Sequence, residues 1–109
     1  MIARRWTASA SDEGARAYVS FFERVLVPQL DGIEGHRGAL VLTRPADDGD
    51  GVEITVLTFW ASMDAISRFA GPTPDLAVVE PDARAVLLAF DERVEHEEVA
   101  VHTLRAPPR

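Results

Sequence analysis

Arg4 and Trp6 are two residues apart near the start of the chain, a spacing that puts them on one face of a strand. If helices cover that face, Arg4 becomes a cation beside aromatic rings that could bind a carboxylate, a phenolate or an enolate. The alternative is a salt bridge between Arg4 and one of the many acidic residues. Both interpretations remain open from the sequence.

Trp60 ends a segment of alternating apolar residues and also has two interpretations. A buried indole needs a partner for its N–H, which a ligand or a backbone carbonyl can supply. Trp60 therefore either packs in the core or forms the wall of a pocket.

His96, Glu98 and His102 share one face of the last expected strand. A histidine held by a carboxylate could act as a general base near neutral pH. Two ligands at this spacing could also bind one metal ion, but no third ligand is visible, so we expect no metal site. The simpler alternative is a histidine at a strand edge or a dimer interface.

The composition excludes several functions. The 109 residues include no cysteine and no lysine, which excludes disulfides, thiolate metal sites and Schiff-base catalysis. The net charge of -7 argues against nucleic-acid binding. No apolar run approaches the ~20 residues of a membrane helix, and no secretory signal is visible, so we expect a cytoplasmic protein with no membrane partner. Motifs for phosphate loops, dinucleotides and serine nucleophiles are absent.

The strands that would position these residues follow from alternation of apolar side chains. The central one, residues 52–60, is apolar on both faces and leads into a short helix capped by Ser62 and stopped by Gly71. Three further strands are expected at 1–7, 38–44 and 94–104, with the polar residues 45–51 as a hairpin connection.

Helices and loops complete the expected elements. Residues 9–14 are a polar connection in which Ser11 or Asp12 caps a helix from Ala15 to Leu30, and Pro28 should kink or end that helix. A later helix should begin at Pro81 and present one apolar face, made of Ala83, Val86, Leu87 and Phe90. His36 and Arg37 are expected in a solvated turn, and residues 71–79 in a loop that could act as a lid.

The order β-α-β-β-α-α-β is close to the ferredoxin-like order, which predicts an α+β fold with an antiparallel sheet and helices on one face. Because helices cover only one face, Leu57, Phe59 and either Val41 or Ala39 would form an apolar patch in water. A second copy is the simplest cover, so we expect a homodimer through the sheet faces. We expect one domain over residues 1–104 and a disordered tail over 105–109.

Four segments carry a family resemblance: MIARRW, IEGHRG, VLTFWASMDAISRFAG and PDARAVLLAFDERVEHEEV. The tryptophan followed by Ser-x-x-Ala is the best single marker. With these segments the chain resembles the antibiotic biosynthesis monooxygenase superfamily of dimeric α+β barrels over nearly its whole length. That superfamily includes cofactor-free oxygenases of aromatic polyketides, haem-degrading enzymes, decarboxylases and isomerases.

The resemblance implies a cofactor-independent monooxygenase, or a related enzyme, that acts on a small aromatic or enolisable substrate without a cofactor. The pocket would lie between the central strand and the helices, where Trp60, Trp6 and Phe22 would bind the substrate. Arg4 would hold the substrate anion, and His96 would be the catalytic base.

Two departures from the superfamily pattern support other functions. The polyketide oxygenases often carry an asparagine shortly before the matching tryptophan, but here that neighbourhood is Val56 and Thr58. This favours a non-catalytic protein of the same fold that binds small molecules or partners. Haem binding is disfavoured, because no histidine lies between His36 and His96 and the chain has no asparagine.

Overall fold

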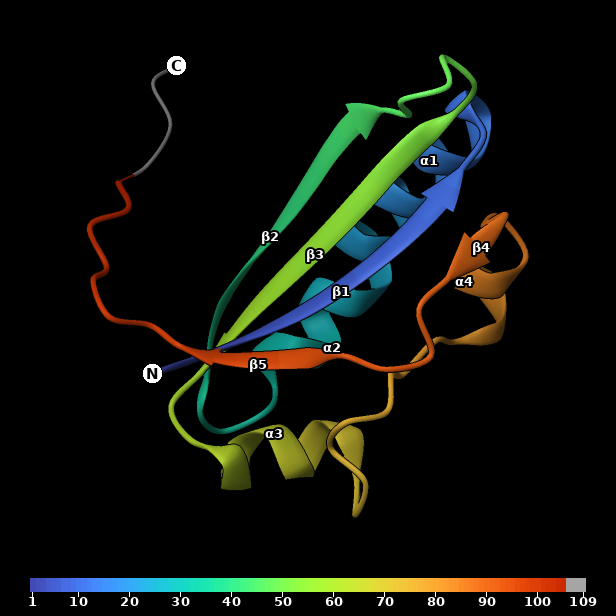
Figure 1. Ribbon diagram of the computed structural model, residues 1–109. Coiled ribbons are helices and arrows are strands. Elements are labelled where there is room, and N and C mark those ends of the chain that lie inside the picture. Colours follow the sequence, from blue (N-terminus) through green and yellow to red (C-terminus); the bar gives the residue numbers. More distant parts are fainter. Residues whose placement is uncertain (106–109) are drawn as a thin grey trace.

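The computed structural model describes residues 1–105 and shows a sheet with its helices on one side (Figure 1). Along the chain the elements are β1 (Ile2–Ala10), α1 (Asp12–Phe21), a π-helix η1 (Phe22–Leu26), α2 (Val27–Asp31), β2 (His36–Pro45), β3 (Val52–Trp60), α3 (Met63–Ala70), α4 (Pro81–Arg84), β4 (Ala89–Phe90) and β5 (Glu95–Glu98). Within the described range, no helix is long and apolar enough to cross a membrane.

The sheet has the strand order β2-β3-β1-β4, and β5 also pairs with β1. All pairs are antiparallel, with β4 opposite Ala8 and Ser9 and β5 opposite residues 2–5. This confirms the predicted α+β class and ferredoxin-like order. The pairing also fixes the site, because it places Arg4 directly opposite His96.

The central strand β3 has the predicted parity. Its side facing the helices carries four buried residues, Ile54, Val56, Thr58 and Trp60. Leu57 and Phe59 lie on the opposite side and are half-buried. At the end of β3, Ser62 accepts a hydrogen bond from the Ala65 amide at 3.2 Å, and Gly71 ends α3 with a φ of 79°, as expected.

The uncovered side of the sheet differs from the prediction in its β2 residues. Leu40 pairs with Leu57 and therefore shares its face, whereas Ala39 and Val41 pack against the core. A β-bulge between His36 and Gly38 sets this register, and a one-residue shift exchanges the two faces. The expected patch of Leu57, Phe59 and Val41 or Ala39 is thus wrong in its last member; Leu40 and Leu42 lie there instead.

Pro28 does not end the long helix, which continues to Asp31. The π-helix η1 lies immediately before it, and its last turn is closed by a hydrogen bond from the Val27 amide to the Phe22 carbonyl. The wider π turn accommodates the ring of Pro28, which would otherwise clash with the backbone carbonyl one turn earlier. Ser11 caps α1 as predicted, accepting from the Gly14 amide at 2.9 Å.

Two strands extend into segments that were expected to be loops. Ser9 and Ala10 belong to β1 rather than to a connection, because they pair with Glu53 and Val52. The expected solvated turn at His36 is wrong as well, since β2 begins there and only 5% of the histidine side chain is exposed.

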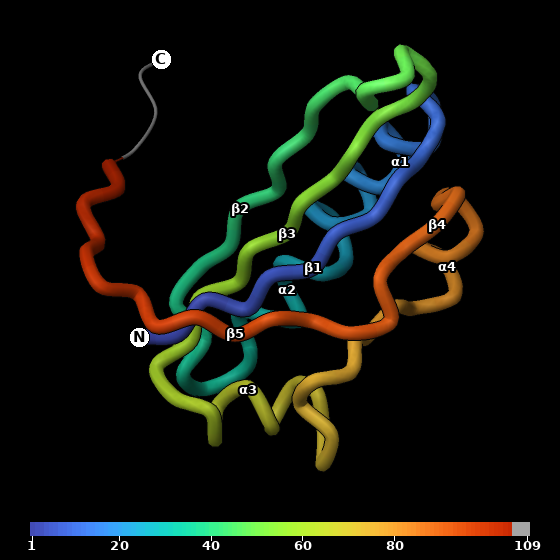
Figure 2. Tube along the Cα trace, in the orientation of Figure 1, coloured from blue at the N-terminus to red at the C-terminus, as the bar shows by residue number. Residues whose placement is uncertain are grey.

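The predicted C-terminal elements are too long. The helix that begins at Pro81 ends at Arg84, because the Leu88 amide donates to the Ser9 carbonyl at 2.8 Å and draws the chain into the sheet. The last strand ends at Glu98 rather than residue 104: its pairing with β1 ends at Ile2 and Glu98, and the Val99 amide donates to the Met1 carbonyl at 3.0 Å. Residues 100–105 are exposed and run away from the sheet (Figure 2). Of the expected tail 105–109, residues 106–109 lie outside the described range.

Candidate functional site

Arg4 projects from β1 toward the helices and is 4% exposed. Its Nη1 donates to the Pro74 carbonyl, and its Nη2 donates to the Leu76 carbonyl at 2.8 Å. No carboxylate within residues 1–105 forms a salt bridge with it, so the expected ion pair is not made. Burial lowers the pKa of Arg4 to about 10, partly opposed by the nearby carboxylate of Asp75. The guanidinium therefore stays charged at neutral pH while it lacks a countercharge in contact.

His96 projects from β5 to the same side of the sheet, and its Nε2 lies 3.1 Å from Nη1 of Arg4. A guanidinium can only donate, so Nε2 accepts and the imidazole carries its proton on Nδ1. That Nδ1 lies 3.6 Å from Oδ1 of Asp75. Burial, and then the charge of Arg4, lower the pKa of His96, and Asp75 opposes them. The imidazole is neutral at pH 7 and can accept a proton.

The other expected members of the histidine face are elsewhere. Glu98 lies 3.8 Å from the N-terminal amine, and His102 is exposed beyond the end of β5. The carboxylate that faces His96 is Asp75, which the sequence analysis did not single out. Within residues 1–105, no group of three histidine or carboxylate side chains is placed to hold a metal ion.

A cavity of about 50 Å³ lies beside Arg4, between the sheet and the helices. Its polar and aromatic lining comes from Arg4, Trp6, Tyr18, Phe22, Thr58 and Phe69, and residues 77–80 close one side. The centre of the Trp6 ring is 5.8 Å from that of Tyr18, and the Phe69 ring centre is 5.8 Å from Cζ of Arg4. This volume holds a few water molecules and is too small for an aromatic ring.

Trp60 lies behind the lining of the cavity rather than in it. It is fully buried, and its Nε1 donates to Oγ1 of Thr58 at 2.8 Å. The centre of its ring lies 5.7 Å from that of Phe69, on which it stacks. The centre of the His36 ring lies 5.0 Å away, in a T-shaped arrangement. The geometry matches the core interpretation, and the expected contact of Trp60 with a substrate stays a prediction. Trp6 and Phe22 do line the cavity, although their binding roles also remain predictions.

The loop between α3 and α4 covers the cavity and is attached at two places. The carbonyls of Pro74 and Leu76 accept from Arg4, as described above. The Ala77 amide donates to the Glu92 carbonyl at 2.8 Å, and the Val94 amide donates to the Asp75 carbonyl at 2.9 Å. A ligand that reaches Arg4 must therefore replace the loop carbonyls on its guanidinium.

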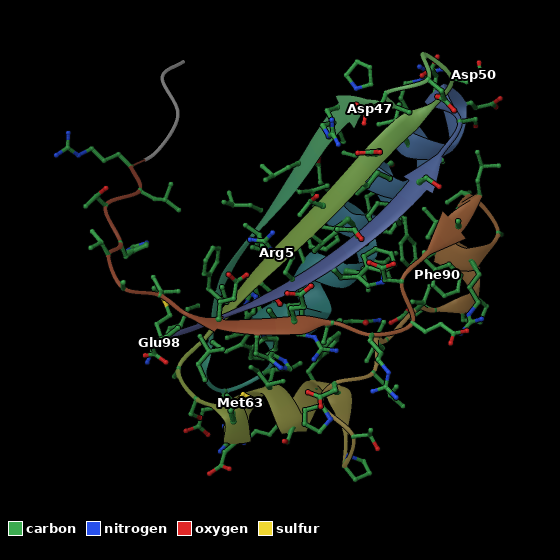
Figure 3. The ribbon with its side chains drawn as sticks, in the orientation of Figure 1. Arg5, Asp47, Asp50, Met63, Phe90 and Glu98 are labelled. Carbon is green, nitrogen blue, oxygen red and sulfur yellow. The ribbon has the colours of Figure 1, made fainter. Side chains whose placement is uncertain are left out.

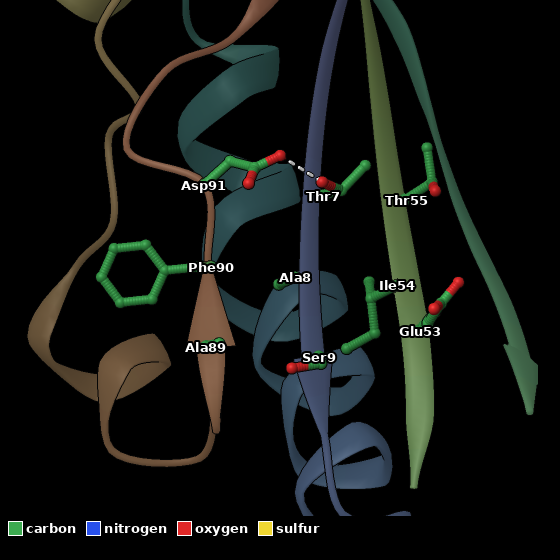
Figure 4. A pocket seen from close by; sticks show the side chains of 9 residues that line it. All are labelled: Thr7, Ala8, Ser9, Glu53, Ile54, Thr55, Ala89, Phe90 and Asp91. Atoms are coloured by element: carbon green, nitrogen blue, oxygen red, sulfur yellow. Dashed lines mark hydrogen bonds between the residues drawn. The ribbon is translucent and has the colours of Figure 1, made fainter. Parts of the chain in front are cut away.

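A second hollow, of about 320 Å³, lies on the uncovered side of the sheet beside β4 (Figure 4). Thr7 donates to the carboxylate of Asp91 there, and the carboxylate of Glu53 pairs with Arg44. Both carboxylates of this hollow thus already have partners, and we assign it no chemistry.

Solved structures with the same fold are known. A protein from Bacillus cereus named as a candidate antibiotic biosynthesis monooxygenase is 15% identical, with a TM-score of 0.60 over 94% of this chain and 97% of its own. A similarly named protein from Chloroflexus aurantiacus is 19% identical, with a TM-score of 0.56 over 94% and 96%. A variant of SnoaB, a cofactor-independent oxygenase from Streptomyces nogalater, is 20% identical, with a TM-score of 0.53 over 96% and 97%.

The chain has the fold of the antibiotic biosynthesis monooxygenases. No protein-family model and no curated protein matches its sequence. At such identities the likeness to this monooxygenase fold establishes architecture, and the activity must be argued from the chain's own site.

Proposed function

We propose that the protein is a cofactor-independent monooxygenase, or a related enzyme, for a small aromatic or enolisable substrate. One observation carries the proposal: a buried guanidinium without a contacting carboxylate faces a neutral histidine at an aromatic cavity. A cation held in this way favours an oxyanion, because charge that develops beside it is stabilised in a low dielectric. The oxygenase SnoaB, which shares the fold, adds support by analogy.

In the proposed reaction, His96 takes a proton from a phenol or an enol. The lone pair of its Nε2 takes the proton once Nη1 of Arg4 no longer donates to it, and Asp75 faces the opposite nitrogen, where it stabilises the protonated ring. Arg4 gives up its bond to the Pro74 carbonyl and donates to the new substrate oxyanion instead. The proton then lies on His96, and the negative charge lies on the substrate oxygen beside Arg4.

The oxyanion then reacts with dioxygen. It transfers one electron to form superoxide and a substrate radical, and these combine at carbon to give a hydroperoxide after protonation by His96. Loss of water from a hydroperoxide at a former CH₂ group leaves a carbonyl. The balance is R₂CH₂ + O₂ → R₂C=O + H₂O, in which the substrate supplies all the electrons.

The second candidate is a protein of this fold that binds a small molecule without turnover. The cavity of about 50 Å³ favours it, because no aromatic substrate fits while Arg4 holds the loop carbonyls. Related oxygenases often carry an asparagine shortly before the tryptophan, whereas this chain has Val56 and Thr58 in that neighbourhood. The missing asparagine also favours the second candidate. The two candidates share the anion site and differ in whether dioxygen reacts there.

Oxygen uptake with anthrone-like and dihydroxyaromatic compounds tests the proposal. We expect uptake by the wild type, and a loss of at least tenfold in Arg4→Gln and in His96→Gln, since one positioned base or charge contributes typically 10²-fold or more. His102→Gln is the matched control and should retain full activity, because His102 is exposed and outside the site. Uptake equal in all four proteins rejects the oxygenase for those compounds. Binding lost only in Arg4→Gln, without uptake in any protein, supports the second candidate.

A further inference from the structure

The loop between α3 and α4, residues 71–80, covers the cavity but has little packing of its own. None of its residues is buried, and its apolar side chains Leu76 and Val78 are 42% and 43% exposed. Residues 77–80 nevertheless close one side of the cavity. A segment with so few buried apolar contacts opens easily, so polar contacts must keep this loop in place.

The strongest of these polar contacts come from Arg4. Its guanidinium donates to the carbonyls of Pro74 and Leu76, and its charged donors make hydrogen bonds roughly twice as strong as those of a neutral amide. The other attachments are neutral backbone bonds to the segment before β5, such as the one from the Ala77 amide to the Glu92 carbonyl. The position of the loop therefore depends mainly on one buried cation.

The same guanidinium is the anion site of the proposed function, and its two roles exclude each other. The carbonyls of Pro74 and Leu76 occupy the N–H groups that an anion would need. An anion is a stronger acceptor than a neutral carbonyl and takes over these donors when it reaches them. An aromatic ring does not fit the cavity of about 50 Å³, so it can enter only after the loop has moved.

We propose that residues 71–80 are a lid, which Arg4 holds closed in the free protein and which an aromatic anion releases when it binds to Arg4. The release rests on the proposed function of Arg4 as the anion site, whereas the closed contact does not. A ligand shifts such an equilibrium only if it binds one state better than the other. A neutral ring of the same shape cannot replace the carbonyls on Arg4, so the lid admits ligands by their charge.

Hydrogen exchange of single amides, followed by NMR, tests the closed contact in the free protein. The Ala77 and Val94 amides bond across the edge of the lid, and the Leu88 amide, which donates to the Ser9 carbonyl, is the reference outside it. Arg4→Met should raise the exchange of both lid amides about tenfold or more, the range for hydrogen bonds to a charged group, and leave Leu88 unchanged. Equal rates in the variant and the wild type would overturn the lid. A rise of the same size at Leu88 would also overturn it, because Arg4 would then stabilise the whole fold.

Benzoate and benzamide test the release, because they have nearly the same shape and differ in charge. Benzoate should bind to the wild type in calorimetry and raise the exchange of the Ala77 and Val94 amides, whereas benzamide should leave both amides unchanged. Benzoate that binds without changing these amides would overturn the lid and leave the anion site standing. If benzoate does not bind, the anion site fails, and the release of the lid by an anion fails with it.

A variant that weakens the lid without changing Arg4 gives an independent readout. Ala77→Pro removes the amide that donates to Glu92 and should tighten the binding of benzoate about fivefold, the effect of one neutral hydrogen bond, because the lid opens more readily. Thr73→Pro is the matched control. Thr73 is exposed, its amide has no hydrogen-bond partner within residues 1–105, and it already precedes a proline. Binding by Ala77→Pro that is equal to or weaker than binding by Thr73→Pro would contradict a lid that opens for the ligand.

Discussion

Two histidines are held neutral by burial, and this makes stability depend on pH. Burial lowers the pKa of both His36 and His96 in the folded state, whereas the unfolded chain has the ordinary value near 6.5. The unfolded state therefore binds more protons below that pH. The stability from the neutral rings is complete above pH 6.5 and is lost as the pH falls through the lowered values.

We therefore expect the free energy of unfolding by urea to fall between pH 7 and pH 5. His96→Gln and His36→Gln should each reduce this dependence. His102→Gln should not, because that residue is exposed. A free energy of unfolding that stays constant or rises on acidification would contradict the burial argument for both histidines.

At the residue scale, the sequence predicted part of the site for a clear reason. The alternation of side chains placed Arg4 with Trp6 on one face of a strand, but the sequence left open which face carries His96, because only the pairing of β5 with β1 sets it. Asp75 could not be predicted, because it lies in a loop without periodicity. The pattern also placed Tyr18 on the apolar face of the first helix, from which it lines the cavity.

At the element scale, close packing of α1 against the chain after α4 depends on a glycine. A Cβ built on Gly14 would lie 2.3 Å from the carbonyl oxygen of Val86, a backbone atom that cannot rotate away. Alanine has a helix propensity about 1 kcal/mol better than glycine, but overpacking typically costs 1–3 kcal/mol. We expect Gly14→Ala to lower the free energy of unfolding by about 1 to 2 kcal/mol.

Gly32→Ala is the matched control for this prediction. Gly32 has a φ of -80°, and a Cβ there would lie 3.5 Å from the Gln29 carbonyl, an ordinary contact. The change should be neutral, or stabilise by up to about 1 kcal/mol. Urea denaturation measures both variants, and equal stability of the two would show that the contact with Val86 is relieved easily.

The elements that the sequence predicted well are those whose boundaries depend on local chemistry. β3 and α3 have an alternating pattern, a serine cap and a glycine stop within one segment. The ends of α4 and β5 instead depend on distant partners. After α4, the Leu88 amide donates to the Ser9 carbonyl, and after β5, the Val99 amide donates to the Met1 carbonyl. No local sequence pattern therefore marks either boundary.

At the scale of the whole molecule, the uncovered sheet face predicts a homodimer. Leu40, Leu57 and Phe59 are half-buried there and Leu42 is 49% exposed, while Arg5 projects from the same face and pairs with Glu97 (Figure 3). Face-to-face packing of two copies would remove these apolar side chains from water.

Sedimentation at micromolar concentrations tests the dimer. Phe59→Asp should dissociate it, because the variant buries an unpaired charge at the interface. Met63→Asp is the control, since it adds the same charge to an exposed residue at the start of α3 and should leave association unchanged. A monomeric wild type would contradict both the dimer and the closed barrel expected from it.

The central claim is that Arg4 forms an oxyanion site, and the negative charge of the whole molecule allows a direct measurement of it. A protein with a net charge of -7 raises the pKa of a bound phenol through its general field, so a lowered pKa must come from a local cation. The ionisation of bound 4-nitrophenol can be followed by its absorbance, in the wild type and in Arg4→Gln. We expect 4-nitrophenol bound to the wild type to ionise at a lower pH than free 4-nitrophenol, and this shift to vanish in Arg4→Gln. A bound phenol that ionises at the same or a higher pH in the wild type would contradict an oxyanion site at Arg4.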